Sequence, residues 1–175
     1  GGDVMAKIKR NNSIVAQNDG SNAEWVFNNE CNHDKGSVNY NISGIDVLKD
    51  DMIYFEVDCG TNNASADLYW RPIIEYTALE NADAPSLDKG YKVVDDIEKH
   101  TQGYNGWLYM YKDSEKNEYG NMSWNSKSGN EVQFTDGDNR IGKFGIMPGY
   151  NRPTVIGWKA PYSGTVTLSP TDDIL

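Results

Sequence analysis

The sequence has little of what most catalytic and metal centres are built from. Its 175 residues include only two histidines and two cysteines. His33 and His100 each lie in a polar stretch with no serine or cysteine nucleophile motif beside them. None of these residues shows the spacing of a metal site. The 26 acidic residues are numerous enough for a carboxylate pair, but no spacing places two of them at hydrolytic separation. We therefore expect a protein that is not an enzyme.

The two cysteines leave two states open. Cys31 and Cys59 could form one disulfide in an oxidising compartment, or remain a pair of reduced, half-buried thiols. Two cysteines are too few to define a disulfide framework, so the fold must rest on its apolar core.

Long apolar runs are also missing, and charge of one sign dominates. No run approaches the roughly 20 residues that span a bilayer. The formal net charge of −10 repels nucleic acid and anionic membrane surfaces. We therefore expect neither nucleic acid nor a membrane as a partner.

Short alternating segments separated by Gly, Asn and Asp turns are abundant. In 53–57, for example, Ile53, Phe55 and Val57 form one apolar face, which is typical of a half-buried strand. This pattern predicts an all-β fold, an antiparallel β-sandwich of jelly-roll type. One helical turn is expected in 93–100. The segments that alternate in this way are 4–12, 41–58, 68–79, 107–113, 132–136, 141–147 and 153–160.

A polar connection, ENADAPSLDKG (80–90), divides the strand segments into two groups. It predicts a long loop or linker around 78–100. A boundary between two domains at this point is the alternative, but each half would then give only a thin sandwich. We expect a single domain over 1–175.

Four stretches carry a resemblance to a known class of modules. IGWKAPYSGTVTL (156–168) resembles a W-x-A-P-x-S-G-x-V signature, and KDDMIYFEVD (49–58) a G-D-x-I-x-F-x-V strand. LYWRPIIEY (68–76) is similar to W-x-P-x-I-x-Y, and VMAKIKRNN (4–12) to V-x-A-x-I-x-K-N-G. Together they resemble the β-sandwich carbohydrate-binding modules of large secreted bacterial carbohydrate-active proteins. Among these, the likeness leans towards starch-binding modules of gut bacterial starch-adherence proteins of the amylosome type.

The order of these motifs differs from that family. Residues 101–168 resemble the first half of a module and residues 4–76 the second half, so the motif order is circularly permuted. Permutation is tolerated where the termini of a domain lie close together. We therefore expect adjacent termini, with the strand at 165–168 pairing with, or lying beside, the strand at 4–8.

The tryptophans separate into two groups. Trp70 and Trp158 lie inside the motifs just named. Trp107 lies in TQGYNGWLYMY (101–111), which resembles the segment that commonly opens such a module. We assign all three to the core. Trp25 and Trp124 lie instead in polar, Asn-rich loops, where a large ring either anchors the loop or stacks on a sugar. We assign these two to carbohydrate binding, with Tyr119 flanking Trp124 and with Asn125 and Lys127 as polar contacts.

The resemblance and the loop aromatics together predict a function. We expect non-catalytic binding of a polysaccharide, with starch or another α-glucan as the first ligand, that tethers a secreted or cell-surface bacterial protein to its substrate. The chain would be a monomeric module within that larger protein. The alternative is a structural spacer or adhesion sandwich. Two oxygen-rich turns, 62–67 and 135–140, have the composition either of a Ca²⁺ site or of solvated turns.

Overall fold

A computed structural model describes residues 5–11, 13–17, 41–59, 68–80, 90–126, 133–143 and 145–170. Every strand pairing in this part of the chain is antiparallel. The strands are β1 (Met5–Arg10), β2 (Ser13–Gln17), β3 (Ile42–Val47), β4 (Met52–Asp58), β5 (Pro72–Leu79), β6 (Tyr91–Lys92), β7 (Trp107–Asp113), β8 (Glu118–Asn121), β9 (Ser123–Asn125), β10 (Gln133–Asp136), β11 (Asn139–Gly142), β12 (Ile146–Met147), β13 (Thr154–Lys159) and β14 (Gly164–Pro170). The helical turns are α1 (Val93–Asp96), η1 (Ile97–Lys99) and η2 (Tyr104–Gly106). The predicted all-β antiparallel sandwich is confirmed.

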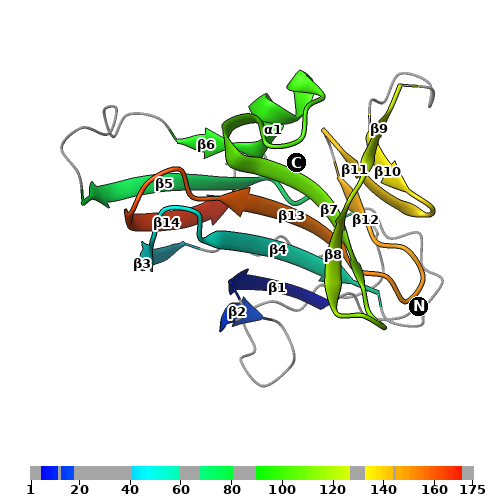
Figure 1. The fold of residues 1–175 in the computed structure, drawn as a ribbon, viewed down its shortest axis with the longest axis horizontal. Helices are drawn as coiled ribbons and strands as arrows, with labels where there is room; N and C mark the ends of the chain where they lie inside the picture. The colour runs from blue at the N-terminus through cyan, green and yellow to red at the C-terminus, as the bar shows by residue number, and fades with distance from the viewer. Residues whose placement is uncertain are drawn as a thin grey trace.

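The larger layer is a six-stranded sheet in the order β2-β1-β4-β13-β7-β8 (Figure 1). Successive side chains of a strand point to opposite faces, so strands in which apolar and polar residues alternate place their apolar side chains on the inner face. Ile53, Phe55 and Val57 of β4 are fully buried, as the alternation predicted. The lysines that alternate with the apolar residues of β1 point to the outer face.

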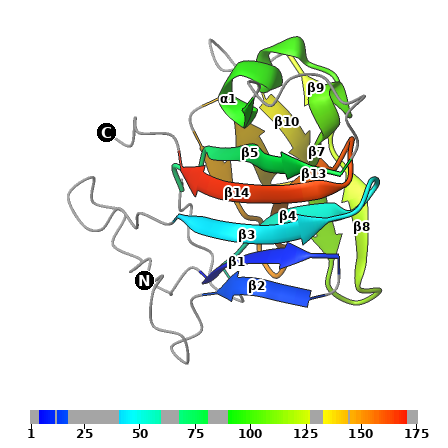
Figure 2. The ribbon, with the colours of Figure 1, turned by 90° about the vertical axis from the view of Figure 1, so that its left-hand side faces the viewer.

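The second layer is a four-stranded sheet in the order β3-β14-β5-β6, and Figure 2 shows it in front of the larger sheet. Its buried residues Val166 and Leu168 belong to the same core as those of the larger sheet. Tyr76 of β5 meets Trp158 of β13 across the layers, with ring centres 5.9 Å apart. A third sheet, β12-β11-β10-β9, lies at one end of the molecule and adds Phe134 and Ile141 to the core.

The three tryptophans assigned to the core are buried. Trp107 and Trp158 are fully buried, and Trp70 is 5% exposed. Trp70 meets Phe55 edge to face, with ring centres 5.5 Å apart. Such offset aromatic contacts are favourable beyond the area that they bury.

The expected partnership between the two ends of the chain is wrong. β14 pairs with β3 and β5, whereas β1 pairs with β4 and β2 in the opposite sheet. Both edges of each strand are thus occupied, and Val166 and Leu168 face the core from the other side. The expected closeness of the two termini falls on residues 1–4 and 171–175, which lie outside the described residues.

The loop expected around 78–100 is shorter in the structure. β5 continues to Leu79, and β6, α1 and η1 occupy Tyr91–Lys99, which includes the predicted helical turn. Val93 and Ile97 of this turn are buried in the common core. Residues 81–89, in the middle of the connection, lie outside the described residues. The segment after them positions His100, the first residue of the site described next.

Candidate functional site

The structure places three of the five predicted binding residues. Trp25 and Lys127 lie outside the described residues. Trp124 and Asn125 belong to β9 in the third sheet, whereas Tyr119 belongs to β8 at the edge of the six-stranded sheet. Tyr119 and Trp124 therefore contribute to two different groups of side chains, and the expectation that Tyr119 flanks Trp124 is wrong.

The Trp124 indole is half-buried, with one face covered by an imidazole. The His100 ring stacks on it with ring centres 3.8 Å apart and planes 16° from parallel. Phe134, opposite Trp124 on β10, meets it edge to face at 5.0 Å. His100 itself is exposed. We call this stacked pair, with its outer surface formed by His100, the His100–Trp124 platform.

Backbone geometry and one glutamine hold His100 against Trp124. His100 follows η1 with a left-handed φ of 57°, which ends the helical turn there. The Gln102 amide then donates to the carbonyls of Tyr109 and Met122, at 2.8 and 2.9 Å, and its oxygen accepts from the Tyr109 N–H at 2.8 Å. Gln102 thereby joins the segment after η1 to β7 and to the residue just before β9.

Polar and aromatic groups neighbour the platform. Asn125 follows Trp124 on β9 and is exposed, as is Lys99, which precedes His100. The Lys99 ammonium lies 5.9 Å from the ring centre of Tyr104, which is 40% exposed. Because successive side chains of a strand point to opposite faces, Asn125 lies on the face of β9 away from the Trp124 ring. Lys99 is an exposed donor that adjoins the platform in the chain, and donors beside ring faces can bond the hydroxyl groups of a stacked sugar.

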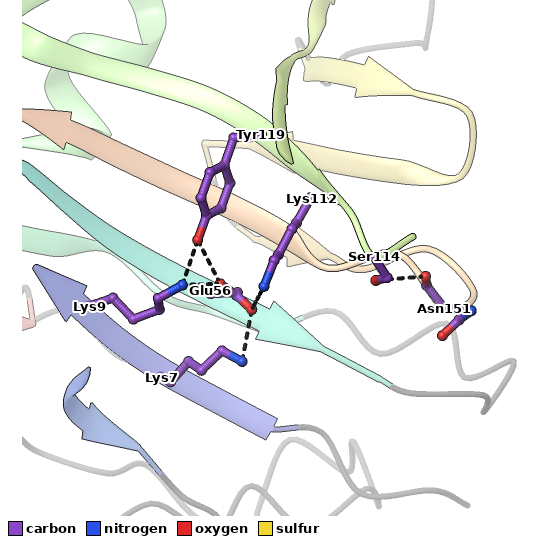
Figure 3. A network of polar contacts seen from close by, with 7 residues as sticks. All are labelled: Lys7, Lys9, Glu56, Lys112, Ser114, Tyr119 and Asn151. Carbon is purple, nitrogen blue, oxygen red and sulfur yellow. Dashed lines mark hydrogen bonds and ion pairs between the residues drawn. The ribbon is translucent and has the colours of Figure 1, made fainter. Parts of the chain in front are cut away.

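Tyr119 belongs to a second group, on the outer face of the six-stranded sheet (Figure 3). Its ring stacks on Tyr54 of β4 with ring centres 4.4 Å apart and planes 7° from parallel. Its hydroxyl accepts a hydrogen bond from Lys9 Nζ at 2.8 Å and donates one to Glu56 Oε2 at 3.2 Å. Both bonds fix the orientation of the phenol. Burial, followed by the charge of Glu56, raises the pKa of Tyr119 well above its usual range.

Glu56 lies at the centre of this second group. Its side chain is 1% exposed, and the ammonium groups of Lys7, Lys9 and Lys112 lie 2.9, 3.7 and 3.8 Å from its oxygens. A carboxylate so buried needs such partners, because the loss of hydration is costly without them. We call these four residues, with Tyr54 and Tyr119, the lysine cluster.

The described residues contain no group of three or more His, Cys, Asp or Glu side chains that could hold a metal ion. In the oxygen-rich turn at 135–140, Asp136 pairs with Arg152 at 2.6 Å. The Asn139 amide points inward and donates to the Arg152 carbonyl at 2.7 Å and to the Thr154 hydroxyl at 2.6 Å. The other such turn, 62–67, lies outside the described residues.

Cys59 is buried, and its thiol donates to the carbonyl of Gly149 at 3.3 Å. Burial raises the pKa of this thiol. Cys31 lies outside the described residues, so the pairing of the two cysteines stays an open prediction.

Sequence reasoning missed both groupings. The sequence placed His100 in a polar stretch and gave it no binding role, and nothing local links it to Trp124, 24 positions later. Alternation along β1 did place Lys7 and Lys9 on one face. The residues opposite them depend on strand order, which alternation does not determine.

The layers and strand order define an antiparallel β-sandwich with two candidate ligand surfaces, the His100–Trp124 platform and the lysine cluster. Scans against protein-family models, curated proteins and solved structures found no match to this chain. In the part of the chain that the structure describes, no helix is long and apolar enough to cross a membrane.

Proposed function

We propose that this chain is a non-catalytic polysaccharide-binding module of an extracellular or cell-surface bacterial protein. The observation that carries the proposal is the His100–Trp124 platform, an exposed imidazole stacked at 3.8 Å on a half-buried indole. Ring faces that remain at the surface and are held in place bind the apolar face of a sugar with little loss of side-chain entropy.

The support of the platform also fits this proposal. Gln102 and the left-handed conformation of His100 fix the stacked rings before any ligand arrives. The exposed ammonium of Lys99, which precedes His100, would bond a hydroxyl of the same sugar or of the next one along the chain. We propose an α-glucan as the ligand, because a curved chain can meet one stacked pair of rings, whereas a flat chain suits a strip of several rings.

The test is retention of the purified chain on insoluble starch, cellulose, xylan and chitin, measured side by side. We expect retention on starch. His100→Ala should reduce that retention at least about fivefold, because stacking of a ligand ring on an aromatic side chain contributes on the order of 1 kcal/mol or more. His100 is exposed, so the variant should lose at most about 1 kcal/mol of stability, through the stacking contact and the left-handed backbone, and should remain folded. Tyr69→Ala is the matched control, because Tyr69 is 41% exposed and belongs to neither surface. Retention on none of the four polymers would overturn the proposal.

One observation favours a second function, that of a structural spacer in a large surface protein. The Trp124 ring packs on Phe134 and on the core, as expected of a ring that anchors a loop. In that case Trp124→Ala would lower the melting temperature while no glycan bound the wild type. Starch binding that His100→Ala weakens while the variant remains folded would exclude the spacer as the whole function.

A further inference from the structure

The lysine cluster holds more positive than negative charge among its described side chains. Lys7, Lys9 and Lys112 all lie within 4 Å of the carboxylate of Glu56. Among the residues that the structure describes, one carboxylate in contact with three ammonium groups leaves an excess of two positive charges, in a chain whose net charge is −10. The charges that act on Lys9 are those of Glu56, Lys112 and Lys7, and burial together with the two lysines lowers the pKa of Lys9. An additional anion would relieve the repulsion among the three ammonium groups.

The ammonium groups are held in place on an aromatic surface. The side chains of Lys9 and Lys112 are only 13% and 16% exposed, so their aliphatic parts are packed down on the sheet. Their Nζ atoms lie 5.5 and 5.9 Å from the ring centre of Tyr119. The Tyr119 ring is fixed in turn by Tyr54 and by its two hydrogen bonds. Ring and charge are therefore preorganised side by side.

The cluster lies on a sheet face to which four strands contribute. Lys7 and Lys9 come from β1, Glu56 from β4, Lys112 from β7 and Tyr119 from β8 (Figure 3). Charges more than about 8 Å away are largely screened at physiological ionic strength, so the nearest charged groups decide which ligand binds.

We propose that the lysine cluster is a binding site for the carboxylate of a uronic-acid-containing polysaccharide. The three lysines already bind one carboxylate, that of Glu56, so their arrangement suits a carboxylate ligand. A uronic acid bears its carboxylate directly on the sugar ring, so the ring can lie against Tyr119 while the charge meets Lys9 and Lys112. The site shares no residue with the His100–Trp124 platform, so either site can fail without the other.

The first test measures the binding of the whole chain to polygalacturonate, with dextran sulfate and soluble starch as comparison polymers. We expect polygalacturonate to bind, and Lys9→Gln and Lys112→Gln each to weaken that binding about fivefold or more. Lys159→Gln is the matched control: Lys159 belongs to the same sheet and is neutralised by Asp50 at 2.9 Å, so its removal should leave binding unchanged. Soluble starch binding should be unaffected by all three variants.

Glu56→Gln separates a ligand site from a purely structural cluster. It removes the carboxylate that competes with the ligand, so polygalacturonate should bind more tightly and raise the melting temperature further than in the wild type. A purely structural cluster predicts a loss of stability that polygalacturonate does not restore.

Three results would overturn the inference. They are no binding of polygalacturonate, equal weakening by Lys159→Gln and Lys9→Gln, and no additional stabilisation of Glu56→Gln by the polymer. Binding of dextran sulfate alone would overturn the assignment to a carboxylate. Starch binding that His100→Ala abolishes, with no binding of polygalacturonate, would contradict this inference while supporting the proposed function.

Discussion

Trp158→Ala removes the ring that most directly joins the two main sheets. Trp158 projects from β13 in the six-stranded sheet and is fully buried. Its ring centre lies 5.9 Å from that of Tyr76 and 5.2 Å from that of Tyr91, both in the four-stranded sheet. Close packing continues on the other side, where a Cβ on Gly106 would lie 3.3 Å from the indole nitrogen. Little can move in to fill the space that the ring leaves.

The expected cost follows from this packing. Replacing a fully buried tryptophan with alanine costs about 3–5 kcal/mol, because the transfer free energy and the cavity add together. For a domain of this size each kcal/mol lowers the melting temperature by roughly 2–4 °C, so a fall of about 6–20 °C is expected. Urea and thermal unfolding, followed by circular dichroism, measure both quantities. Tyr69→Ala, which removes an exposed ring, should stay within about 0.5 kcal/mol of the wild type. A loss below about 1 kcal/mol in Trp158→Ala would refute the sandwich interface described above.

Two further predictions concern a close contact and a buried acid. Gly164→Ala should lower the free energy of unfolding, measured in urea, by about 1–3 kcal/mol or more. The added Cβ would lie 2.2 Å from the carbonyl oxygen of Ala78 and would force β5 and β14 apart. A variant as stable as the wild type would contradict the pairing of these two strands. Burial raises the pKa of Asp96 above its ordinary 3.8, despite the hydrogen bond from Asn105. The folded state therefore holds this proton more tightly than the unfolded state, and the contribution of Asp96 to the free energy of unfolding falls as pH rises from about 3.8 through the folded-state pKa. Asp96→Asn should remove that fall. The free energy of unfolding of the variant, minus that of the wild type, should therefore rise over this pH interval when both are unfolded in urea at successive pH values. A difference that stays constant with pH would contradict the raised pKa of Asp96.

Sequence periodicity predicted the layers of the fold but not their connections. Ile53, Phe55 and Val57 are buried because a period of two assigns alternate side chains to one face. The same alternation holds along β14, where Val166 and Leu168 are buried. It could not tell which strand would lie beside β14, since the inward faces of opposing sheets have the same pattern. The motif order suggested β1, and the structure places that strand in the other layer.

The candidate sites depend on contacts between distant parts of the chain. Trp124 was recognisable as an unusual ring in a polar segment, but its stacking on His100 requires the turn that Gln102 fastens to β7. Tyr119 was grouped with Trp124 because only a few residues separate them. β8 and β9 enter different sheets, so Tyr119 instead meets Tyr54. Where a chain passes from one sheet to another, residues that are close in sequence need not lie close together in the fold.

The most direct measurement of the central claim is a nuclear magnetic resonance titration of the whole labelled chain with a malto-oligosaccharide. If the His100–Trp124 platform binds α-glucan, the signals of the Trp124 indole N–H and the His100 ring should shift saturably, while those of Tyr69 stay in place. If no signal shifts saturably, or if the shifts map to a surface that contains neither His100 nor Trp124, the platform is not the glucan site and the account is wrong.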